Sequence, residues 1–87
     1  MEAVQFSNCT FVVCSFDSAS IKKTTFNDCT FYDKESEQSC SFKFALFDDT
    51  AFKHCDLTMA NFSRAHLYRV TINQCPATGI DFSYVSA

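Results

Sequence analysis

Large hydrophobic residues recur at every fifth position along most of the chain. They form two runs, Phe6, Phe11, Phe16, Ile21, Phe26 and Phe31, followed by Phe42, Phe47, Phe52, Leu57, Phe62, Leu67, Ile72, Ala77 and Phe82. Neither the 3.6-residue period of a helix nor the two-residue period of an ordinary strand produces this spacing. The pattern instead predicts a tight bend after every five residues, in a chain that coils and stacks on itself.

A second series of small residues confirms the five-residue repeat. The position two before each hydrophobic centre reads Val4, Cys9, Cys14, Ala19, Thr24 and Cys29, then Cys40, Ala45, Thr50, Cys55, Ala60, Ala65, Val70, Cys75 and Ile80. All six cysteines lie in this series. If each five-residue unit forms one side of a square, a coil closes every 20 residues, with backbone pairing at roughly 4.8 Å between coils.

The two runs are out of phase by one residue, so a one-residue register break lies between Phe31 and Phe42, within residues 33–39. With coils of 20 residues and one extra at the break, the inward side chains sort into four predicted columns. These are Phe6, Phe26, Phe47 and Leu67; Phe11, Phe31, Phe52 and Ile72; Phe16, Leu57 and Ala77 with a gap at Ser36; and Ile21, Phe42, Phe62 and Phe82.

The composition is that of one small domain of 87 residues with 47% hydrophobic content. The N-terminus has no basic region followed by a hydrophobic one, and no run is long enough to cross a bilayer, so we expect a reducing cytoplasm and no membrane. In that compartment the cysteines are expected to be free core residues; metal binding or redox chemistry is the alternative.

The sequence contains no convincing active site. His54 and His66 fall at outward positions, Cys9 and Cys14 lack zinc-site spacing, and the single glycine, Gly79, excludes a phosphate-binding loop. We therefore predict a protein that is not an enzyme and needs no cofactor or metal. The net charge of −3 argues against direct nucleic-acid binding.

The predicted columns separate the surface charges into two sides. Asp28, Asp48 and Asp49 would lie on an acidic side. Another side would carry four cationic and two aromatic residues: Lys22, Lys23, Lys43, Arg64, Phe44 and Tyr84. This arrangement either protects edges and confers solubility, or marks a binding surface, of which the outward Phe44 is the most suggestive element.

Individual units resemble the consensus of the pentapeptide-repeat proteins. The consensus is a small residue, then Asp or Asn, then Leu or Phe. The clearest units are Cys55–Met59 and Ala60–Arg64, with Ala65–Arg69 similar except for His66 at the second position. The resemblance implies an all-β fold, a right-handed quadrilateral β-helix of about four coils, formed by residues 1–87 as a single domain.

A narrower resemblance lies in residues 29–42, which are similar to the first loop of Qnr-type quinolone-resistance proteins; residues 52–62 and 75–82 resemble the coils that follow. It implies binding to bacterial DNA gyrase or topoisomerase IV, by imitation of duplex DNA, and protection from quinolones. The loop residues Asp33, Lys34, Glu35, Ser36, Glu37, Gln38 and Ser39 inherit the role of a partner-binding loop.

The resemblance implies a longer protein, so we expect this chain to lack the second loop and the C-terminal dimerisation module of Qnr-type proteins. We expect either a truncated topoisomerase-binding factor or, as the alternative, an interaction scaffold with a different protein partner. Its open coil ends are candidate homodimer contacts.

Overall fold

The computed structural model describes residues 1–86, which form strands, turns and bends and contain no helix. Accordingly, no membrane-spanning helix occurs within that range. The strands are β1 (Gln5–Ser7), β2 (Ser20–Lys22), β3 (Thr25–Asn27), β4 (Tyr32–Asp33), β5 (Gln38–Ser39), β6 (Leu46–Lys53) and β7 (His66–Asn73).

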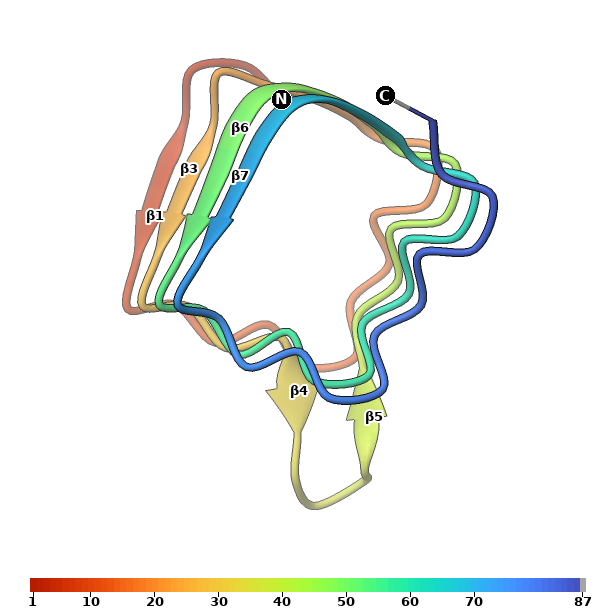
Figure 1. Ribbon diagram of the computed structural model, residues 1–87. Coiled ribbons are helices and arrows are strands. Elements are labelled where there is room, and N and C mark those ends of the chain that lie inside the picture. Colours follow the sequence, from red (N-terminus) through yellow and green to blue (C-terminus); the bar gives the residue numbers. More distant parts are fainter. Residues whose placement is uncertain (87) are drawn as a thin grey trace.

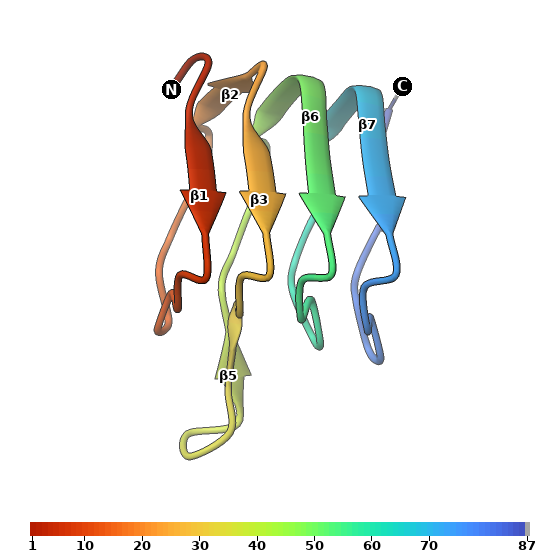
Figure 2. The ribbon, with the colours of Figure 1, turned by 90° about the vertical axis from the view of Figure 1, so that its left-hand side faces the viewer.

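The strands β1, β3, β6 and β7 lie side by side and parallel, one from each successive pass of the coiled chain (Figures 1 and 2). The long strand β6 bends around a corner, so β2 pairs with its first half and β3 with its second half. The pair β4 and β5 stands apart as an antiparallel hairpin. The all-β, parallel part of the predicted fold is therefore confirmed.

The bend after each five-residue unit comes from a residue in the left-handed backbone region. These residues lie two positions after the inward side chains, as at Val13 with φ 48° and Ser18 with φ 61°, except after Phe31, where the hairpin intervenes. The left-handed region costs an L-residue roughly 1–2 kcal/mol, and only Gly79 among these corner residues is a glycine. Stacking between coils must outweigh that cost.

The observed register differs from the predicted one at the break. Thr10 pairs with Thr30, 20 positions later, whereas Thr30 pairs with Asp56, 26 positions later. The coil that contains the break is thus six residues longer than a regular one. The observed columns are Phe6, Phe26, Phe52 and Ile72; Phe11, Phe31, Leu57 and Ala77; Phe16, Phe42, Phe62 and Phe82; and Ile21, Phe47 and Leu67.

The prediction of one inserted residue was wrong about the size of the insertion. A phase shift in a five-residue repeat gives the insertion only modulo five, so one and six extra residues leave the same sequence pattern. The gap expected at Ser36 does not exist, because Phe42 follows Phe16 in its column, with ring centroids 4.9 Å apart.

Stacked phenylalanine rings fill the interior. Along one column, the ring of Phe26 lies 5.0 Å from that of Phe6 and 4.9 Å from that of Phe52, in nearly parallel planes. Neighbouring columns meet edge to face, as do Phe26 and Phe31 at 5.4 Å. Burial of each such ring contributes about 1.5–3 kcal/mol. At the C-terminal end Ile72 and Phe82 remain 38% exposed, and pairing of coil ends stays a prediction.

The cysteines also form columns, with Cys9, Cys29, Cys55 and Cys75 in one and Cys14 and Cys40 in another. All six are free thiols packed in or against the core, which confirms the packing interpretation. The Cys55 Sγ lies 3.2 Å from the carbonyl oxygen of Phe26 and 3.4 Å from that of Lys53, so its single S–H can donate to either one. Burial raises the pKa of Cys40 to about 11 and that of Cys55 to about 12, so both stay protonated near neutral pH.

Candidate functional site

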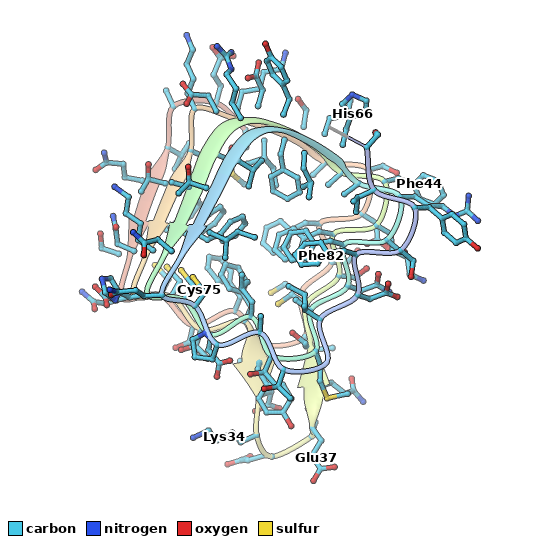
Figure 3. All side chains as sticks on the ribbon, in the orientation of Figure 1. Lys34, Glu37, Phe44, His66, Cys75 and Phe82 are labelled. Atoms are coloured by element: carbon cyan, nitrogen blue, oxygen red, sulfur yellow. The ribbon has the colours of Figure 1, made fainter. Side chains whose placement is uncertain are left out.

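The predicted loop is a hairpin that projects from the coiled body, with Lys34 and Glu37 near its tip (Figure 3). Its strands pair Tyr32 with Ser39 and Asp33 with Gln38. At a regular corner, two residues separate the carbonyl of Phe16 from the amide of Ala19 that binds it at 3.1 Å. At the hairpin, the carbonyl of Phe31 accepts from the amide of Cys40, also at 3.1 Å. Residues 32–39 therefore replace a two-residue turn without disturbing the corner.

Polar contacts within the hairpin order its tip. The Ser36 hydroxyl and backbone N–H donate to Asp33 Oδ2 at 2.7 and 3.3 Å. These bonds lower the pKa of Asp33, with the Ser36 hydroxyl as the main cause, and favour its carboxylate form. At the base, the Ser39 hydroxyl donates to the carbonyl of Phe31 at 2.9 Å.

The hairpin presents an exposed, acidic surface. Residues 34–38 are all exposed. The hairpin carries three carboxylates, Asp33, Glu35 and Glu37, and one ammonium, Lys34, so its net charge is −2. Such a surface suits ion pairs and hydrogen bonds with a basic partner.

Two hydrophobic side chains flank the hairpin, which sequence reasoning missed. Val13 and Met59 hold the corresponding corner position in the coils before and after it, and they are 46% and 53% exposed. The five-residue pattern predicts that both side chains point outward. Their position beside the hairpin follows only from the six-residue size of the insertion.

The predicted acidic side is wrong. Asp28 follows the column of Phe26, whereas Asp48 and Asp49 follow the column of Phe47. There Lys22 pairs in register with Asp48, and Arg69 Nη2 lies 2.8 Å from Asp48 Oδ1. Charges of opposite sign therefore alternate from coil to coil along this column. The error arose from the assumed coil length, which shifted every residue after the break by one column.

The predicted basic and aromatic side is correct in part. Lys43, Phe44, Arg64 and Tyr84 do follow the same column, that of Phe42, Phe62 and Phe82, but Lys22 and Lys23 belong to the next one. Phe44 is 54% exposed and points away from the core at a corner of the coil (Figure 3). The Arg64 guanidinium lies 5.9 Å from the Phe44 ring centroid and 4.9 Å from that of Tyr84.

Residues 1–86 enclose no pocket and bring no three potential metal ligands together. His54 and His66 are exposed, and His66 Nδ1 lies 2.7 Å from the Ser86 hydroxyl.

Comparison with known families and proteins agrees with this geometry. The family model of pentapeptide repeats, in eight copies, matches residues 45–83. The quinolone resistance pentapeptide repeat protein QnrB96 of Scandinavium goeteborgense is 40% identical over 79 residues, which cover 91% of this chain and 37% of that protein. The pentapeptide repeat protein QnrB4 of Escherichia coli is 43% identical over 75 residues, covering 86% and 35%.

A solved structure shows the same architecture. A trypsin-treated variant of QnrB1, described as a plasmid-mediated fluoroquinolone resistance protein, superposes with a TM-score of 0.92 at 40% identity. The match covers 94% of this chain and 39% of that one. The chain thus spans little more than a third of the length of these relatives.

Proposed function

We propose, since the chain belongs to the pentapeptide-repeat proteins and is similar to QnrB proteins over most of its length, that it binds bacterial type II topoisomerase and relieves quinolone inhibition. The names of these relatives state quinolone resistance, and none indicates an enzyme. The partner would be DNA gyrase or topoisomerase IV, which would place the protein in the bacterial cytoplasm.

The observation that carries this proposal is the hairpin of residues 32–39. It interrupts a repeat that closes its corner without it, since Cys40 still donates to the carbonyl of Phe31. It is nevertheless ordered by its own hydrogen bonds and carries a net charge of −2 at an exposed tip. Ordered loops on a rigid scaffold commonly carry function, and an acidic one suits a surface that binds DNA.

We propose imitation of DNA in shape rather than in charge. Asp28 lies in a different column from Asp48 and Asp49, and Asp48 is paired with Arg69. The body therefore lacks the continuous row of negative charge that a duplex presents, one charge per roughly 1.7 Å. Under this proposal, the hairpin would make the electrostatic contacts with the partner.

We also infer that the body is the right-handed quadrilateral β-helix of about four coils. An offset of 20 residues between Thr10 and Thr30 corresponds to four five-residue units in each regular coil. Connections between parallel strands of one sheet are right-handed in about 98% of cases.

The test is a gyrase supercoiling assay with ciprofloxacin, together with binding to immobilised gyrase. We expect the wild-type chain to restore supercoiling, and Glu37→Gln to weaken binding about fivefold. Asp49→Asn is the matched control, because both acids are exposed and left-handed, with φ 56° and 54°. No rescue together with no gyrase binding by the folded wild-type chain would remove the proposal.

An interaction scaffold for a different protein is the second candidate. The alternation of Lys22, Asp48 and Arg69 and the exposed Phe44 and Tyr84 favour it. Failure to bind gyrase or topoisomerase IV by a chain that is folded by circular dichroism would select this function.

A further inference from the structure

Two aromatic residues and one arginine follow one another along a single corner of the body. The first of them, Phe44, lies at a different corner from the one from which the hairpin projects (Figure 3). We call Phe44, Arg64 and Tyr84 the aromatic–arginine ridge. They occupy the same corner position in three successive coils. The Arg64 guanidinium lies over both rings, 5.9 Å from the centroid of Phe44 and 4.9 Å from that of Tyr84.

The fold does not account for these residues. All three are left-handed, with φ 59°, 60° and 57°, where bulky side chains are disfavoured. Phe44 and Tyr84 are 54% and 80% exposed, so they add little to the core. The first coil carries Ser18 at this position, which shows that the repeat closes the same corner with a small polar residue. Large apolar groups held outside the core at a conformational cost mark a contact surface.

The ridge has hydrogen-bond donors to offer and few acceptors. Within residues 1–86 the one ion pair joins Arg69 and Asp48. The Arg64 guanidinium therefore pairs with no carboxylate, although the Arg64 backbone N–H donates to the carbonyl of Ser83 at 2.8 Å. The carboxylates on the adjoining surface are already engaged. Asp17 accepts from the Lys43 backbone N–H at 3.1 Å, and Asp81 from that of Ser83 at 2.8 Å.

We propose that the aromatic–arginine ridge is a second binding surface, for a protein segment in which a carboxylate side chain adjoins a large apolar one. The carboxylate would bind the open edge of the Arg64 guanidinium, in the bidentate geometry that arginine favours. The apolar side chain would lie against Phe44 and Tyr84. A nucleic-acid occupant fits less well, because the chain carries a net charge of −3. The proposal does not depend on the hairpin or on a topoisomerase partner.

The test is an NMR titration of the ¹⁵N-labelled full chain with an acetylated and amidated peptide of alternating Glu and Leu. We expect saturable shifts centred on the amides of residues 44, 64 and 84, with an affinity of about millimolar. Arg64→Gln and, separately, Phe44→Ser should each weaken binding about tenfold. Lys23→Gln is the matched control: it removes the same charge at an exposed, left-handed corner residue and should leave the affinity unchanged.

Circular dichroism would check that each variant is folded, and one folded ridge variant is enough for the comparison with Lys23→Gln. The proposal is overturned if the peptide causes no saturable shifts, or if Lys23→Gln weakens binding as much as the ridge variants do. It is also overturned if a poly(dT) oligonucleotide binds the ridge as tightly as the peptide, or if the same amides shift on dilution without peptide, which would indicate self-association.

Discussion

The coiled body and the hairpin are ordered by different forces. In the body, a residue such as Phe52 is fixed by a ring of its own coil, Phe62 at 5.9 Å, and by rings of the preceding coil, including Phe26 at 4.9 Å, while Ile72 follows it in the next coil. In the hairpin, order comes from bonds within ten residues of sequence, such as Ser36 to Asp33 and Ser39 to Phe31. The body is thus cooperative across coils, whereas the hairpin is a local addition to it.

This difference separates stability from recognition. In a solenoid, each repeat is stabilised by its neighbours, so a change in a central coil propagates and a change at an end does not. A local hairpin at an intact corner should be removable without loss of the body.

The largest effect is expected from a cavity at the centre of the body. Phe52→Ala should lower the free energy of unfolding by about 3–5 kcal/mol, because the side chain is fully buried. Phe82→Ala, at an end position that is 38% exposed, should cost less than half as much. Urea unfolding monitored by circular dichroism measures both, and equal losses would contradict cooperative stacking across coils.

A pH-dependent loss of stability should follow from the buried thiols. The pKa of Cys55 is raised from 9.0 to about 12 in the folded chain, so the folded state holds this proton more tightly than the unfolded state. Its contribution is fully present below pH 9 and is lost as the pH rises toward 12. In thermal unfolding from pH 8 to 11, Cys55→Ala should therefore show a shallower decline than wild type. Parallel declines would contradict burial as the cause.

Removal of the hairpin should have only a small effect on the body. Replacement of residues 32–39 by Ser-Gly recreates a two-residue corner. It should raise the free energy of unfolding by no more than about 1 kcal/mol, because closing a shorter loop costs less entropy. If the inserted segment were a single residue, this replacement would shift the register of every later coil. A decrease of several kcal/mol in the free energy of unfolding, measured with urea, would show that the six-residue size of the insertion is wrong.

The smallest effect concerns the corner residues. Val13 is a β-branched residue at φ 48° with 46% exposure, so Val13→Asn should raise the free energy of unfolding by about 0.5–1 kcal/mol. Val12→Asn is the control, because Val12 is 57% exposed but is not left-handed. A gain of equal size at both positions would indicate a general surface effect instead of relief at the corner.

The sequence predicts the body well because one physical rule repeats at every unit. A large side chain every fifth residue, with a small one two positions before it, identifies which residues face inward, and Phe26, Phe42 and Cys55 are all buried as expected. The family resemblance adds the identity of the loop. Both inferences rest on patterns that are local along the chain.

The sequence could not predict which residues stack. Adding five residues to an insertion does not change the phase of a five-residue repeat. The sequence pattern therefore predicts that Phe26 stacks on Phe47, whereas it stacks on Phe52. The same ambiguity placed Asp28 beside Asp48 and hid the Asp48–Arg69 ion pair. Only the backbone pairing between coils, a nonlocal property, resolves the size of the insertion.

The most direct test of the division between body and hairpin is quinolone protection by the hairpin-replaced chain. Wild type and the Ser-Gly replacement of residues 32–39 would be compared in the gyrase supercoiling assay with ciprofloxacin, with urea unfolding of the same samples. We predict that the wild-type chain restores supercoiling, and that the replaced chain fails to do so although it unfolds at an equal or higher urea concentration. Full protection by the replaced chain would contradict the role assigned to the hairpin.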